Sequence, residues 1–119
     1  MKIIVAEDDK MLSEMICGIL RDGGHIAVPA FDSVQVMFAA TNQPPDLVLL
    51  DISMPGGTGV EVLRKLKMLK KTKDVPVIVI SGNTDPDMPA QVVAMGAHAY
   101  IAKPIDPEVL LRTVASSVL

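Results

Sequence analysis

Two apolar runs decide the fold of this chain: Leu47-Val48-Leu49-Leu50 and Val77-Ile78-Val79-Ile80. Neither run alternates between apolar and polar side chains, which is typical of strands covered on both faces in a parallel sheet between helices. Three further short apolar runs also carry β-branched residues and predict additional strands. The five expected strands span residues 2–6, 25–30, 47–50, 75–80 and 97–102.

The segments between these runs have helical character. Apolar residues recur every three or four positions from Met11 to Leu20, before Gly23-Gly24, which predicts a first helix and its end. Further helices are expected over 33–42, 59–71, 85–95 and 106–117. The third has a basic side that carries Lys65, Lys67, Lys70 and Lys71. The alternation of strands and helices predicts a doubly wound α/β domain with five parallel strands and helices on both faces.

The composition excludes several classes of protein. The chain has 119 residues, half of them hydrophobic, which is the size and character of one globular domain. Eleven basic against fourteen acidic residues give a formal charge of −3, so direct nucleic-acid binding is not expected. Cys17 is the single cysteine and no apolar run is long enough to cross a membrane, so a cytoplasmic protein without membrane contact is expected.

Polar residues follow the predicted strands, at the edge where doubly wound sheets bind ligands. Glu7-Asp8-Asp9 follows the first strand, Asp51 the third, Ser81-Gly82 the fourth and Lys103-Pro104 the fifth. Carboxylates this close together need a positive partner, because otherwise each raises the pKa of the others. A hard divalent cation meets that need, and Mg²⁺ is favoured because it takes few protein carboxylates and leaves positions for water or phosphate.

This set of side chains favours chemistry at phosphorus. A carboxylate beside a divalent ion and a lysine can attack a phosphoryl group, and a hydroxyl such as Ser81 can hydrogen-bond the phosphoryl oxygens. The product would be an acyl phosphate on Asp51. Asp9, by contrast, is expected to be a solvated turn residue without a part in the site.

The residues at these four strand ends resemble those of the receiver domains of two-component response regulators. The resemblance covers the whole chain, residues 1–119, as a single receiver domain of the chemotaxis-receiver type. It is carried by four segments, at the ends of the first, third, fourth and fifth expected strands: residues 4–9, 45–55, Ser81-Gly82 and 96–104. It implies a flavodoxin-like, three-layer α/β/α fold with strand order 2-1-3-4-5.

The resemblance also implies a role for each site residue. Asp51 would accept the phosphoryl group, while Glu7, Asp8, Asp51 and the backbone carbonyl of Ser53 would hold Mg²⁺. Ser81 and Lys103 would contact the phosphoryl group, Ser81 and Tyr100 would change position in the switch, and Lys103-Pro104 would be a cis peptide bond. The partners implied are a sensor histidine kinase or histidine phosphotransfer protein and an output protein or effector domain, which would meet the face of the fourth and fifth helices and fifth strand.

Two other functions fit parts of the pattern. A phosphatase with Asp51 as nucleophile would need a general acid two residues further on, where the chain has Ser53. A flavin or nucleotide carrier would need a glycine- or hydroxyl-rich loop after the first strand, where the chain is acidic. A regulatory phosphoacceptor without turnover of free substrates is therefore expected.

The loop after Asp51 has glycines at positions 56, 57 and 59, which predicts an unusually permissive backbone there.

Overall fold

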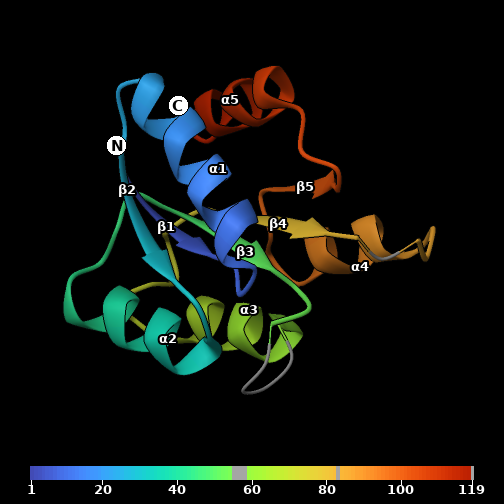
Figure 1. The fold of residues 1–119 in the computed structure, drawn as a ribbon. Coiled ribbons are helices and arrows are strands. Elements are labelled where there is room, and N and C mark those ends of the chain that lie inside the picture. The colour runs from blue at the N-terminus through green and yellow to red at the C-terminus, as the bar shows by residue number, and fades with distance from the viewer. Residues whose placement is uncertain (55–58, 83, 119) are drawn as a thin grey trace.

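The computed structural model describes residues 1–54, 59–82 and 84–118 (Figure 1). Strands and helices alternate along these residues. The strands are β1 (Lys2–Ala6), β2 (Ile26–Ala30), β3 (Leu47–Asp51), β4 (Val77–Ser81) and β5 (Ala99–Ala102). The helices are α1 (Lys10–Asp22), α2 (Ser33–Asn42), α3 (Gly59–Met68), α4 (Met88–Ala94) and α5 (Pro107–Ser116).

All strand pairs are parallel, and their order in the sheet is β2-β1-β3-β4-β5. This confirms the expected doubly wound, flavodoxin-like topology. The strand order reverses between β1 and β3, where the chain leaves β1 toward β2 on one side and later returns to β3 on the other. The carboxyl ends of these two central strands therefore meet at the point where such sheets bind ligands.

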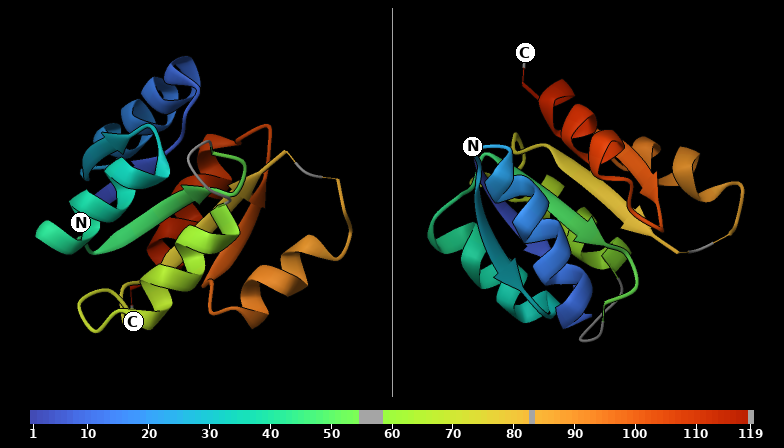
Figure 2. Two further views of the ribbon diagram at one scale, coloured as in Figure 1. Left: turned by 90° about the horizontal axis from the view of Figure 1, so that it is seen from below. Right: turned by 45° about the horizontal axis from the view of Figure 1, so that its top comes forward.

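The sheet separates two hydrophobic cores (Figures 1 and 2). Alternate residues of one strand serve opposite cores: Val48 and Leu50 pack toward α2, α3 and α4, whereas Leu47 and Leu49 pack toward α1 and α5. All five residues of β3 and all five of β4 are buried. The absence of polar alternation in these two runs is thus explained, because both of their faces lie under helices.

Three aspartates set the starts of helices. The side chains of Asp9, Asp32 and Asp106 accept hydrogen bonds from backbone N–H groups in the first turns of α1, α2 and α5. Helix α5 follows the predicted pattern, with Asp106 as N-cap and Pro107 in the first turn. These caps fix where the chain turns from each loop into the helix above or below the sheet.

Two helices are shorter than the sequence predicts. Helix α3 ends at Met68 rather than at residue 71, because the buried Thr72 hydroxyl donates a 2.7 Å hydrogen bond to the Leu66 carbonyl and closes a turn. Helix α4 begins at Met88 rather than at residue 85 and has Pro89 in its first turn. Proline is tolerated there because the first turn of a helix needs no backbone donor.

Gly59 has a role that the sequence did not reveal. Its N–H donates to the Ile52 carbonyl at 2.9 Å, and a Cβ atom at this position would lie 2.3 Å from the Ile52 Cα atom. The glycine is therefore required by a close approach of two backbones. The other glycines of this loop, at positions 56 and 57, lie outside the described residues.

We expect Gly59→Ala to lower the free energy of unfolding by more than about 2 kcal/mol, since the new methyl group meets backbone atoms that cannot rotate away. Gly18→Ala is the matched control. Gly18 lies inside α1 with no atom within 4 Å of an added Cβ, so this change should stabilise the domain by about 0.5–1 kcal/mol. Urea unfolding of both variants measures the two effects, and equal stabilities would contradict the assignment of the close approach.

Candidate functional site

The carboxyl ends of the strands bring the predicted site residues to one edge of the sheet. Glu7 directly follows β1, Asp51 ends β3, Ser81 ends β4 and Lys103 follows β5. The backbone ties the last three ends together: Ile52 N–H donates to the Ile80 carbonyl at 3.1 Å, and Lys103 N–H donates to the Ser81 carbonyl at 2.9 Å. The position of each side chain is therefore fixed by the sheet itself.

Lys103 joins the two buried carboxylates of the site. Its Nζ lies 2.9 Å from Glu7 Oε1 and 3.2 Å from Asp51 Oδ2. The other oxygen of Asp51, Oδ1, accepts a 2.9 Å hydrogen bond from the Ser53 N–H group. The Asp51 carboxylate is thus oriented by a backbone donor on one oxygen and faces the ammonium group with the other. The Lys103-Pro104 peptide bond that leads out of the site is cis, as the resemblance implied.

Burial dominates the electrostatics of Glu7, which has no exposed surface. Burial raises the pKa of this carboxyl from 4.5 to about 7, against the lowering effect of Lys103 and of the Asp9 N–H group. Burial also tends to lower the pKa of Lys103, but its contacts with Glu7 and Asp51 outweigh that effect and leave its pKa above the ordinary value. To keep both Glu7 and Asp51 ionised at neutral pH, the pocket would therefore need more positive charge than Lys103 supplies.

The carboxylates fit a divalent cation. One oxygen atom from each of Glu7, Asp8 and Asp51 can be chosen so that all three lie within 4.8 Å of one another. Among the described residues, buried Glu7 Oε1 has no hydrogen bond of good geometry, although Lys103 Nζ lies at ion-pair distance. Asp8 is exposed and leaves one side of the group open to solvent. Three converging oxygen ligands with an open side suit Mg²⁺.

Asp9 lies outside this group of carboxylates, but it is a helix cap rather than the solvated turn residue that the sequence predicts. Its carboxylate accepts hydrogen bonds from the N–H groups of Met11 and Leu12 and so begins α1. Its own N–H group donates to Glu7 Oε2 at 3.1 Å. The residue is thus a helix cap, and its backbone helps to hold the buried carboxylate of Glu7 in place.

The remaining predicted residues lie around the same edge. Ser81 is fully buried at the end of β4. Tyr100 lies in β5 opposite Val79 and is half-buried against the core under α4. Ser53 is exposed just after Asp51, and Pro104 is exposed just after Lys103. The sequence analysis did not predict the hydrogen bond from the Ser53 N–H group to Asp51 or the close approach of Gly59 to Ile52. A glycine shortly after Asp51 was a signal for the close approach.

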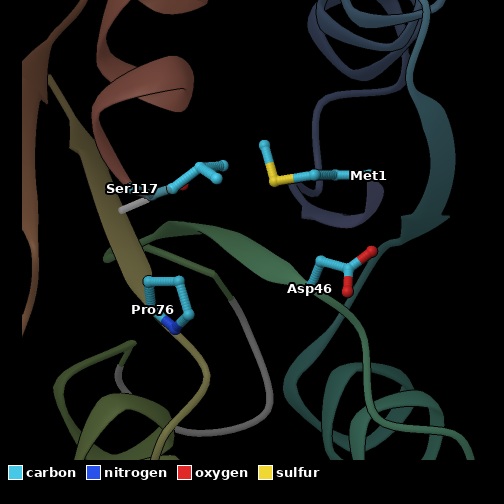
Figure 3. A pocket seen from close by; sticks show the side chains of 5 residues that line it. Met1, Asp46, Pro76 and Ser117 are labelled. Carbon is cyan, nitrogen blue, oxygen red and sulfur yellow. The ribbon is translucent and has the colours of Figure 1, made fainter.

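A pocket of about 470 Å³ opens elsewhere in the molecule (Figure 3). Its lining includes Met1, Asp46 and Pro76, which lie at the opposite, amino-terminal ends of the strands. The Asp46 carboxylate in this pocket accepts a 2.7 Å hydrogen bond from the Lys2 N–H group. It does not share the grouping of carboxylates and lysine seen at the carboxyl edge, so the candidate site remains the one around Asp51.

A doubly wound α/β domain with strand order 2-1-3-4-5 and a polar site at the carboxyl ends of its central strands defines the flavodoxin-like class of domains. The family model for the response regulator receiver domain matches residues 3–115. The chain belongs to this family, the receiver domains of two-component systems.

Curated relatives cover nearly the whole chain. The chain is 32% identical over 113 residues to the phosphate regulon transcriptional regulatory protein PhoB of Escherichia coli (strain K12), and the match covers 95% of this chain and 49% of PhoB. It is 34% identical to the DNA-binding response regulator MtrA of Mycobacterium leprae (strain TN), with 95% and 49% covered. The chain thus spans about half the length of these relatives.

Solved structures show the same fold. The chemotaxis response regulator CheY4 of Vibrio cholerae superposes with a TM-score of 0.91 at 26% identity, over 98% of both chains. The receiver domain of NtrX from Brucella abortus gives a TM-score of 0.90 at 30% identity, over 98% of this chain and 97% of that one. No helix in the part of the chain that the structure describes is long and apolar enough to cross a membrane.

The raised pKa of Glu7 predicts a pH-dependent stability in the absence of divalent cations. The contribution of such a carboxyl is fully present below its ordinary pKa of 4.5 and is lost as the pH rises toward 7. We expect Glu7→Gln to remove this loss, so that near pH 8 the variant exceeds the parent in free energy of unfolding by on the order of 3 kcal/mol.

Urea unfolding in EDTA at several pH values measures this difference. Glu14→Gln, a change of an exposed carboxylate on α1, is the control and should leave the pH profile of the parent unchanged. A Glu7→Gln profile parallel to that of the parent would show that Glu7 ionises normally in the folded domain.

Proposed function

We propose that this domain is a phosphorylation switch in which Asp51 accepts a phosphoryl group with Mg²⁺ bound. The observation that carries the proposal is the contact of Lys103 Nζ with both Glu7 and Asp51, beside a third carboxylate from Asp8. Glu7, Asp8, Asp51 and the backbone carbonyl of Ser53 would hold the ion. When bound, Mg²⁺ would neutralise negative charge on the phosphoryl oxygens during transfer.

The transfer itself would use the carboxylate of Asp51 as nucleophile. An oxygen of Asp51 forms a bond to phosphorus while the bond from phosphorus to the donor breaks, and the donor is a phosphohistidine of a kinase or phosphotransfer protein, or a small acyl phosphate. The Ser53 N–H group holds the carboxylate in orientation through its 2.9 Å hydrogen bond. Lys103 would stay with the negative charge as that charge passes from the carboxylate to the phosphoryl group, and its 3.2 Å distance to Asp51 Oδ2 supports this role.

The response would run from β4 to β5. The hydroxyl of Ser81 would move to the phosphoryl group, and Tyr100 would turn inward against the core next to β4. Such a movement changes the surface formed by α4, β5 and α5, where the output protein or effector domain would bind. We also propose that residues 1–119 act as one regulatory unit in the cytoplasm. The domain would not turn over free substrates. No observation favours the phosphatase alternative.

Incubation with acetyl phosphate and Mg²⁺ should modify the parent domain and leave Asp51→Asn unmodified, because the amide cannot form the acyl phosphate. Intact-mass measurement detects the added phosphoryl group, and EDTA should prevent its addition. Asp22→Asn, which changes an exposed carboxylate at the far end of α1, is the control and should label like the parent. Equal labelling of Asp51→Asn would refute the assignment of the acceptor.

The proposed switch also predicts a separation of labelling from response. We expect Ser81→Ala to keep phosphorylation at Asp51 while losing most of the change at Tyr100, since the hydroxyl links the phosphoryl group to β5. The NMR signals of the Tyr100 ring before and after addition of a beryllofluoride mimic report that change. A full response in Ser81→Ala would contradict the role of Ser81 but not that of Asp51.

A further inference from the structure

Positive charge is concentrated in one short stretch of the chain. Six of the eleven Lys and Arg residues lie between Arg64 and Lys73, and this stretch contains no acidic residue. The rest of the chain carries fourteen acidic and five basic residues, a net charge of −9. The formal charge of −3 is therefore the sum of a positive charge within residues 64–73 and a net negative charge over the rest of the chain.

Three of the five lysines in this stretch, Lys65, Lys70 and Lys73, make no side-chain hydrogen bond within the described residues, whereas Lys71 Nζ donates to the Thr41 carbonyl at 3.4 Å. Arg64 pairs with Glu61, and Lys67 Nζ donates to the carbonyls of Val75 at 2.8 Å and Lys73 at 3.3 Å. Within the described ranges, no carboxylate lies within 4.0 Å of the exposed ammonium groups of Lys65, Lys70, Lys71 and Lys73. These four lysines, together with Met68 and Leu69, form what we call the basic turn.

The basic turn is held firmly by its backbone. The buried Thr72 hydroxyl donates to Leu66, Lys73 N–H donates to the Leu69 carbonyl at 2.8 Å, and Val75 N–H donates to Thr72 at 3.0 Å. The turn thus projects its lysines from a fixed scaffold, which reduces the entropy that a bound partner must remove.

Two apolar side chains lie among the lysines. Met68, the last residue of α3, is 67% exposed, and the following residue Leu69 is 40% exposed, although both side chains are apolar. The surface therefore offers hydrophobic contact as well as charge. Such a mixture suits a polypeptide that carries both carboxylates and an aliphatic side chain.

The basic turn lies away from the candidate phosphorylation site. Helix α3 starts beside Ile52 at the carboxyl edge and runs back, so the turn after it precedes Pro76 and β4 at the amino edge of the sheet (Figure 2). A partner bound there would leave the surroundings of Asp51 open. The inference therefore does not depend on the proposed function.

We propose that the basic turn is a docking surface for a short acidic polypeptide segment with at least one aliphatic residue. Glu61 lies about one helical turn before Lys65, and Asp74 directly follows Lys73, so a broad anionic surface such as a membrane or a duplex would also meet these acidic residues. A short segment can lie between them. The stretch has no aromatic side chain to stack on bases, and its one guanidinium is paired with Glu61, which disfavours nucleic acid.

The test uses a fluorescent peptide of about twelve residues built from Glu-Glu-Leu repeats, a serine version of it, and the full chain. We expect the leucine peptide to bind at low salt more tightly than the serine peptide. Lys70→Glu with Lys73→Glu should weaken binding by roughly tenfold or more. Lys10→Glu with Arg112→Glu makes the same change in net charge elsewhere on the surface and should leave binding within about twofold. Thermal unfolding of both pairs checks that they fold.

Methyl NMR of methionine locates the bound peptide. The signal of Met68 should shift on addition of the leucine peptide, whereas that of Met11, which is 83% exposed on α1, should not. The proposal is overturned if both charge-reversal pairs weaken binding equally, or if Met68 does not shift. It is also overturned if anionic vesicles or duplex DNA bind the turn more tightly than the peptide, or if the peptide merely displaces a second copy of the chain, as sedimentation would show.

Discussion

The structure depends on the sharing of one ammonium group by two buried carboxylates. Glu7 and Asp51 lie almost without solvent contact, and Lys103 Nζ lies close to both. Two buried anions against one cation would leave an excess of negative charge, which is costly in a medium of low dielectric constant and which the raised pKa of Glu7 reduces by favouring its protonated form. A further positive partner at this site would reduce that excess, and the oxygen atoms of Glu7, Asp8 and Asp51 could hold such a cation.

The parallel sheet brings the residues of this site together with only short connecting loops. Parallel strands place their carboxyl ends on one edge, so four residues far apart in sequence meet without long loops. The two cores on either side of β1, β3 and β4 hold those ends in register. A site built on strand ends is thus stabilised by apolar packing that contains none of the polar side chains of the site.

The sequence predicted the parts of the fold that follow from hydrophobic pattern. It identified the five strands, their parallel arrangement and the edge where Glu7, Asp51, Ser81 and Lys103 lie, because buried runs and polar strand ends are local signals. The strand order came from the family resemblance. The end of α3 could not be read from apolar spacing, because it depends on a hydroxyl of Thr72 that bonds to the backbone only in the folded turn. The close approach of Gly59 to Ile52 likewise involves two backbones that sequence spacing does not bring together.

The early end of α3 also determines where the lysines of the basic turn lie. Had the helix continued to residue 71, Lys70 and Lys71 would have occupied successive helical positions about 100° apart. The turn at Thr72 instead gathers Lys70, Lys71 and Lys73 at the amino edge of the sheet, remote from the acidic site. The domain measures 34 × 32 × 30 Å, several times the screening length of about 8 Å at physiological salt. The basic turn and the acidic site lie at opposite edges of the sheet, so salt weakens the interaction between their exposed charges.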